Sequence, residues 1–156
     1  MKLSHKKNQR QLKGQGKKIG IVCAKFNEVI TQRLLKACLE ELRNLGVKDK
    51  DITSVWVPGS FDIPLVALKI AKKKNIDAVI CLGAVIKGET YHFEMIAQGV
   101  ARGIGRVALL SEKPVIFGIL TTYNESQAYR RSESPNNKGK DAAVAAIEMA
   151  NLITQI

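Results

Sequence analysis

The chain has 156 residues, of which 46% are apolar, 5% aromatic and 25% charged, and its formal net charge at pH 7 is +11. A chain of this length can bury most of the surface that its unfolded form exposes, so we expect a globular fold and exclude a disordered protein or a disulfide scaffold. The longest apolar runs, such as 79–86, are far shorter than the roughly 18 residues of a membrane-spanning helix, so we expect a soluble protein.

The positive charge is concentrated at the N-terminus. Residues 1–18 contain six lysines, one arginine and no acid, which leaves a net charge of +4 for the rest of the chain. Nucleic-acid-binding domains usually carry their cations in a folded patch, whereas these lie in a segment rich in Gln, Lys and Gly. We therefore interpret 1–17 as a flexible basic arm and 18–156 as one domain. A weak RNA or anion contact by the arm is the alternative.

Strands and helices are predicted to alternate, beginning with a strand at 18–24, a helix at 31–45 and a strand at 53–57. Short apolar runs rich in β-branched residues are typical of parallel strands that are covered on both faces. The first helix places Leu34, Leu35, Cys38, Leu42 and Leu45 on one face, and Gly46 provides a C-terminal stop.

The second half of the chain continues the same alternation. Pro64 opens the second helix, and a strand at 77–83 precedes a long helix at 89–110. In that helix Gly99 and Gly103 are spaced to let another backbone approach closely. The last elements are a strand at 115–120 and two helices at 125–131 and 140–153.

This order predicts an α/β fold, a three-layer α/β/α sandwich with a four-stranded parallel sheet, because right-handed crossovers place helices on both faces. Ligands in such folds bind beyond the carboxyl ends of the strands. We therefore expect the site to be built from the segments 25–27, 58–62, 84–92 and 121–123.

Several kinds of site are excluded by what the sequence lacks. No G-x-G-x-x-G follows the first strand, and there is no G-x-x-x-x-G-K-[ST], so we expect neither a dinucleotide nor a P-loop nucleotide. With one histidine in the domain and no carboxylate cluster, we expect no metal. Cys23, Cys38 and Cys81 show no C-x-x-C spacing and lie in apolar segments, which predicts buried, reduced thiols and a cytoplasmic location.

His92 is the most informative single residue, because it falls in the first turn of the long helix at the expected ligand edge. A helix N-terminus favours the neutral imidazole, which can accept a proton, and offers backbone N–H groups to an anion. A purely structural histidine is the alternative.

Phe26 and Phe61 both lie on strand-to-helix turns. They are either core residues or a platform for a planar ring, whose polar edge Ser60 and Asp62 could bind. Asp62, close before Pro64, also fits a helix N-cap. Four cations lie near the interruption between the last two predicted helices: Arg130, Arg131, Lys138 and Lys140. They are either solvated or bind a phosphate.

Most of these residues lie in five motifs that resemble the lumazine synthase family, in order and over nearly the whole domain. The motifs are KFN at 25–27, VPGSFDIP at 57–64, LGAVIKGETYHFE at 82–94, PVIFGILTT at 114–122 and NKGKDAAVAAIEMANL at 137–152. The resemblance implies a flavodoxin-like fold and a transferase of riboflavin biosynthesis with no cofactor. The enzyme would condense 5-amino-6-ribitylaminouracil with 3,4-dihydroxy-2-butanone 4-phosphate to 6,7-dimethyl-8-ribityllumazine.

The resemblance also implies roles for individual residues. His92 would transfer protons, and Glu89, Thr90 and Arg131 would bind the phosphate. The pyrimidine and its ribityl chain would contact Phe26, Ser60, Phe61, Asp62, Ala84, Val85, Ile86, Phe117 and Lys138. Asp62 stands where the family more usually has Glu, which shortens its reach by one methylene.

The resemblance further implies that Phe117, Arg131 and Lys138 are supplied by a neighbouring subunit, so we expect a homopentamer. Closure of twelve pentamers into a sixty-subunit shell is left open, since the segment 132–137 departs from the family pattern. Riboflavin synthase is a possible further partner. A carrier that binds a flavin or lumazine without forming it is the alternative function.

Overall fold

The structure, a computed structural model, describes residues 12–156, so most of the basic arm lies outside the described residues. Four strands and five α-helices alternate in the predicted order. They are β1 (Ile19–Ala24), α1 (Glu28–Asn44), β2 (Ile52–Val57), α2 (Ile63–Ala71), β3 (Ala78–Ile86), α3 (His92–Ser111), β4 (Val115–Thr122), α4 (Glu125–Arg131) and α5 (Lys138–Ile153). Short 3₁₀ turns at Asp49–Asp51 and Ser60–Asp62 precede β2 and α2.

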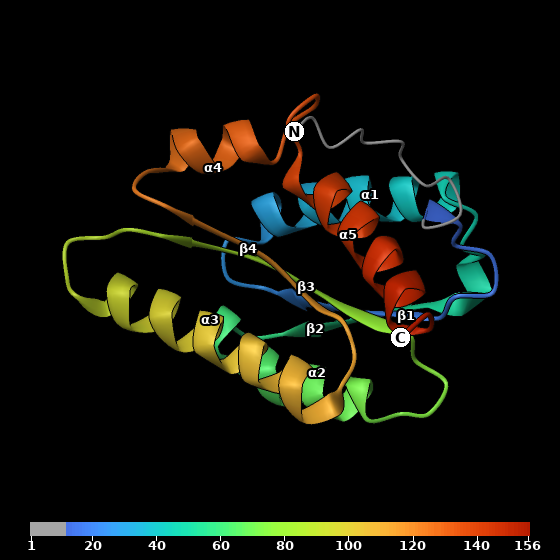
Figure 1. The fold of residues 1–156 in the computed structure, drawn as a ribbon. Helices are drawn as coiled ribbons and strands as arrows, with labels where there is room; N and C mark the ends of the chain where they lie inside the picture. The colour runs from blue at the N-terminus through green and yellow to red at the C-terminus, as the bar shows by residue number, and fades with distance from the viewer. Residues whose placement is uncertain (1–11) are drawn as a thin grey trace, which may run out of the picture.

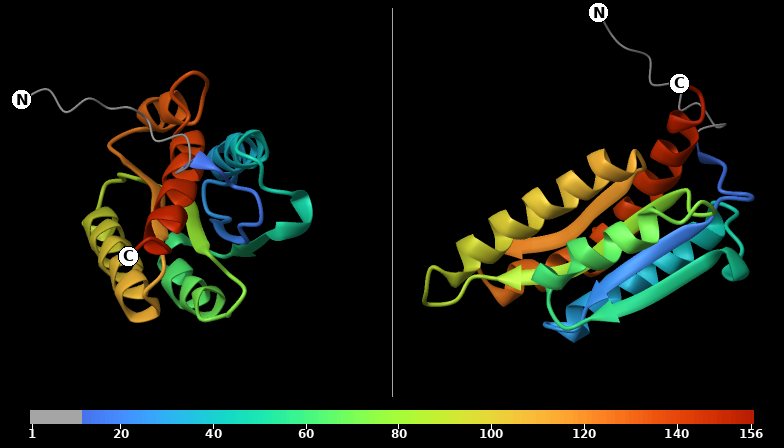
Figure 2. Two further views of the ribbon diagram at one scale, coloured as in Figure 1. Left: turned by 45° about the vertical axis from the view of Figure 1, so that its right-hand side comes forward. Right: turned by 90° about the horizontal axis from the view of Figure 1, so that it is seen from below.

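The strands form one parallel sheet in the order β2-β1-β3-β4. Helices α1 and α5 cover one face and α2 and α3 the other (Figure 1, Figure 2). This confirms the predicted three-layer sandwich, and the strand order is that of flavodoxin-like folds. The winding direction reverses between β1 and β3, so their carboxyl ends flank the switch point at which such folds bind ligands.

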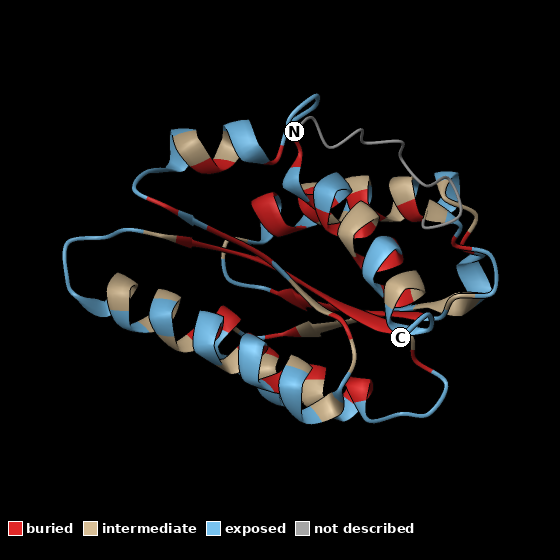
Figure 3. Cartoon of the chain, viewed as in Figure 1, coloured by how far each residue is buried: buried red, intermediate tan, exposed pale blue. Residues whose placement is uncertain are grey.

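Each face of the sheet carries its own apolar core. Every residue of β1 is buried, and so is every residue of β3 except Ile86, whereas the helices expose their outer faces (Figure 3). On one face Ile21 packs among residues of α1 and α5, and on the other Val22 packs among residues of α2 and α3. Burial on both faces explains why these strands are continuous apolar runs and show no alternation.

The end of α1 confirms the predicted stop at Gly46, which takes a left-handed backbone with φ 98°. The Gly46 N–H donates to the Arg43 carbonyl at 3.0 Å and the Val47 N–H to the Leu42 carbonyl at 2.9 Å. This pair of bonds is a Schellman motif, and Leu42 and Val47 are both buried in the same core.

Five predicted boundaries were wrong by two or three residues, including the start of α1, which lies at Glu28, and the end of β4, which lies at Thr122. The third strand continues past residue 83 to Ile86, because β4 pairs with it as far as Thr122. Helix α3 begins at His92, after an exposed turn at 88–91. Helix α5 begins at Lys138, because the Asn137 side chain caps it.

The Asn137 side chain joins α5 to α1. It is buried, accepts a hydrogen bond from the Gly139 N–H at 2.8 Å, and donates to the carbonyls of Ser132 at 2.7 Å and Arg33 at 3.2 Å. Gly139 then packs directly against the backbone of α1, where a Cβ atom would overlap the Leu34 carbonyl. A side chain larger than hydrogen therefore has no room at position 139.

The three cysteines are buried and unpaired, as predicted, and burial raises the pKa of each thiol to about 12. We therefore expect none of them to react with Ellman's reagent at mildly alkaline pH, since the thiolate is the nucleophile. All three should react once denaturant unfolds the protein. Rapid release of chromophore from the native protein would contradict the burial of Cys23, Cys38 and Cys81.

Candidate functional site

The turns after β1, β2 and β3 meet at the carboxyl edge of the sheet. The Phe26 N–H donates to the Pro58 carbonyl at 3.1 Å. The Asn27 side-chain amide donates to the Ala84 carbonyl at 2.8 Å, and its own backbone is left-handed with φ 59°. These bonds hold the turn that carries Phe26 against the neighbouring strands on both sides.

The turns and the start of α3 enclose a cavity of about 420 Å³, a volume typical of small-molecule sites. Eight of the predicted site residues line it: Phe26, Ser60, Phe61, Ala84, Val85, Ile86, Thr90 and His92. Pro58, Gly59 and Gly88, which lie in the expected segments 58–62 and 84–92, also line it. Phe93 and Ile96 complete the lining and were not predicted. Phe93 and Ile96 are one helical turn apart on α3, which is the only sequence signal that they share.

The two phenylalanine rings present apolar surface to solvent. Phe26 is 72% exposed and Phe61 is 62% exposed, so the alternative that they are core residues of the subunit is wrong. Gly99 of α3 leaves room for the Phe61 ring, because a Cβ atom there would lie 3.0 Å from it. Gly103 does the same for Pro64. The expected close approach at these glycines is thus made by side chains and not by another backbone.

The two polar residues beside Phe61 behave differently. Ser60 is 6% exposed and lines the cavity, and its Oγ occupies the space that a Cβ atom on Gly83 would need. Asp62 is exposed, and its carboxylate accepts a hydrogen bond from the Gly59 N–H at 2.9 Å. Asp62 takes the N-cap position of α2, as the helix-cap interpretation expected, but its side chain makes no hydrogen bond to α2 and caps the preceding 3₁₀ turn at Ser60–Asp62 instead.

His92 is the first residue of α3 and is exposed at the cavity. Its N–H lies 3.4 Å from the Thr90 hydroxyl, and Glu89 is exposed in the same turn but does not line the cavity. An imidazole, a side chain able to accept or donate a proton, therefore lies at the amino end of a helix, an arrangement that can serve a reaction on an anionic substrate.

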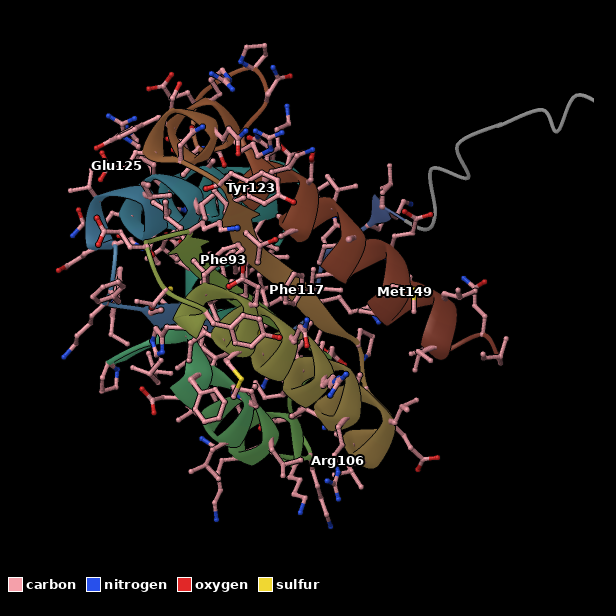
Figure 4. All side chains as sticks on the ribbon, turned by 90° about the vertical axis from the view of Figure 1, so that its left-hand side faces the viewer. Phe93, Arg106, Phe117, Tyr123, Glu125 and Met149 are labelled. Atoms are coloured by element: carbon pink, nitrogen blue, oxygen red, sulfur yellow. The ribbon has the colours of Figure 1, made fainter. Side chains whose placement is uncertain are left out.

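The remaining predicted residues lie on a different surface. Phe117, Arg131 and Lys138 line a groove of about 380 Å³ along β4 and α5, which shares no residue with the cavity. Phe117 is labelled on β4 in Figure 4 and is 43% exposed. The Lys138 ammonium pairs with Asp141 at 3.0 Å, and Arg131 donates to the Gln127 carbonyl at 3.1 Å. One subunit alone does not bring the two groups of residues together.

Within residues 12–156, no three His, Cys, Asp or Glu side chains come together as a metal-binding cluster. No helix in that range is both long enough and apolar enough to cross a membrane. His92 is the only histidine in that part of the chain.

Residues 16–154 match the family model described as 6,7-dimethyl-8-ribityllumazine synthase. The chain belongs to this family. The match covers every strand and α-helix of the structure, and it confirms the resemblance inferred from the five motifs. As a member of the lumazine synthase family, the chain is a transferase of riboflavin biosynthesis that forms lumazine.

Proposed function

We propose that this chain condenses 5-amino-6-ribitylaminouracil with 3,4-dihydroxy-2-butanone 4-phosphate, releasing phosphate and water, as the penultimate step of riboflavin biosynthesis. The observation that carries the proposal is the cavity at the switch point, where two exposed phenylalanine rings and His92 meet in a chain of the lumazine synthase family. No cofactor is needed, because each step is an addition or an elimination.

The pyrimidine binds against the Phe26 ring, with Phe61 close to its ribityl chain. An exposed aromatic face is well suited to stack on a planar heterocycle. Ser60 and Asp62 hydrogen-bond the polar edge of the ring and the hydroxyls of the chain. The end of β3 forms the wall of the ring site, through Ala84, Val85 and Ile86.

The phosphate binds at the turn of Glu89 and Thr90, and Arg131 of the neighbouring subunit completes the subsite. Arginine holds a phosphate through two parallel N–H bonds, whereas a lysine acts as a point charge. Phe117 and Lys138 enter from the same neighbour and close the pyrimidine side.

The reaction begins when the 5-amino group attacks the ketone and water leaves to form an imine. Loss of a proton next to the imine then expels phosphate, and ring closure by the ribitylamino nitrogen releases a second water. Holding the two substrates in contact lowers the free-energy barrier by about 7 kcal/mol or more. His92 accepts and returns the protons that these steps move.

Replacement of His92 by alanine is expected to slow turnover by roughly 10- to 1000-fold without abolishing it, the scale of one acid–base residue or somewhat less. The measurement is kcat against pH, with circular dichroism to establish that the variant is folded. An unchanged rate across the pH range would remove His92 from the mechanism.

The proposed reaction is tested by mixing the purified protein with both substrates and following lumazine fluorescence. A Phe26→Ala variant serves as the control for the ring site. Absence of fluorescence at high protein concentration would favour a carrier that binds the ring without forming it.

The assembly follows from the shared site. If each cavity receives residues from the next subunit, the same contact repeats head to tail and closes into a ring. We propose a homopentamer in the cytoplasm, with the two small molecules as substrates and riboflavin synthase as a further partner. Closure of twelve such rings into a sixty-subunit shell is the alternative assembly.

A further inference from the structure

An ion pair spans the turn at 88–91, which joins β3 to α3. Lys87 is the first residue after β3, and Glu94 lies in the first turn of α3. The Lys87 Nζ lies 3.2 Å from the Glu94 Oε1, and the Lys87 main-chain N–H donates to the Thr122 carbonyl at 2.9 Å. One partner is thus anchored to the sheet and the other to the helix, with the whole turn between them.

The Glu94 carboxylate has an unusual environment for an acid in this chain. Its Oε2 is buried and makes no hydrogen bond to another residue in the described part of the chain. Its own main-chain N–H and then Lys87 lower the pKa of Glu94, against the opposing effect of partial desolvation. The carboxylate is therefore charged near neutral pH, and the Lys87 ammonium is its counter-ion.

The Tyr123 ring limits where the Lys87 ammonium can lie, and Phe93 lies beside that ring. The Nζ is 5.8 Å from the centre of the Tyr123 ring, and that ring is 6.4 Å from the Phe93 ring. Figure 4, which looks onto this edge, labels Phe93 and Tyr123 there. A cation at this distance from a ring face is attracted to it, so the side chain has a preferred position.

The turn itself has few contacts of its own. All four of its residues are exposed, it contains Gly88, and the contact of its Thr90 hydroxyl with the His92 N–H is long at 3.4 Å. An exposed turn with a glycine loses conformational entropy when it binds a ligand, unless something else already holds it. The Lys87–Glu94 pair is the contact that spans both of its ends.

We propose that Lys87 and Glu94 are positioning residues that hold the turn at 88–91 in the shape that binds the phosphate of the second substrate. The inference rests on the proposed function, since it deepens the phosphate subsite. Neither residue lines the cavity, so both act through the turn. Their loss should weaken phosphate binding and leave pyrimidine binding largely unchanged, because the rings proposed to hold the pyrimidine, Phe26 and Phe61, lie on the turns after β1 and β2 and not on the turn at 88–91.

The kinetic test compares Lys87→Met and Glu94→Gln with the parent, and uses Lys72→Met, an exposed lysine at the end of α2, as control. We expect the KM for the butanone phosphate to rise roughly 10-fold or more in both variants, because small misplacements of a binding group have large effects. The KM for the pyrimidine should stay within about twofold. Lys87→Arg, which keeps the charge, should restore most of the loss. An equal rise in both KM values would overturn the proposal.

A second measurement does not depend on turnover. Amide hydrogen exchange of peptides that cover 87–95 is followed in the intact protein while orthophosphate is titrated. Orthophosphate should slow exchange in the parent, and Lys87→Met should need roughly 10-fold more phosphate for the same protection. If the parent forms no lumazine, the proposed function fails and this titration alone decides the inference. The same phosphate dependence in parent and Lys87→Met would overturn it.

Discussion

Replacing Gly139 by alanine is expected to lower the free energy of unfolding by about 3 kcal/mol or more, the upper range for an overpacked site. The new Cβ atom would overlap the Leu34 carbonyl oxygen and lie 2.7 Å from its carbonyl carbon. These are backbone atoms of α1, so no change of rotamer relieves the overlap. Helix α5 would have to move away from α1, which opens the core on that face of the sheet.

Gly105→Ala is the matched control, because Gly105 also lies in a helix but a Cβ atom there meets nothing within 4 Å. Alanine at that position should leave stability unchanged or raise it by up to about 1 kcal/mol. Denaturant unfolding at one fixed protein concentration measures both effects, since assembly makes stability depend on concentration. An unfolding midpoint for Gly139→Ala equal to that of the parent would contradict the close packing of α5 on α1.

The order of strands and helices could be predicted because strands covered on both faces are continuous apolar runs. The ends of several elements could not be predicted, because tertiary contacts decide them. The last three residues of β3 are strand because β4 lies beside them, and α5 begins early because the Asn137 side chain accepts a hydrogen bond from the Gly139 N–H. The pairing partner of an edge strand and the direction of a capping side chain depend on the folded structure.

The candidate site could be predicted in part, because its place follows from the order of the strands. The rule that ligands bind at the carboxyl ends of strands selects the turns that carry Phe26, Phe61 and His92, and the structure brings these turns to one cavity. The α3 residues Phe93 and Ile96 were missed, because apolar residues one helical turn apart are typical of an ordinary core face. Only the folded structure shows that this face of α3 is open to the cavity at the amino end of the helix.

A subunit separated from its neighbours is expected to lose nearly all turnover, by roughly 100-fold or more, the scale on which a catalytic arrangement depends on correct placement. The reason is that Arg131 and Phe117 lie in a groove that shares no residue with the cavity of the same subunit. Sedimentation and activity measured at the same protein concentrations test this. Activity should fall as pentamers or larger particles dissociate, and a fully active monomer would contradict it.

Mixing two defective variants tests the shared lumazine-forming site most directly. One variant carries Phe26→Ala and His92→Ala, and the other carries Arg131→Ala. Each should form little lumazine alone. After the two are unfolded and refolded together in equal amounts, about one quarter of the sites in head-to-tail rings should combine two intact halves. We predict lumazine formation near one quarter of the rate of parent protein treated in the same way. A mixture no more active than the mean of the two variants would contradict a site shared between subunits.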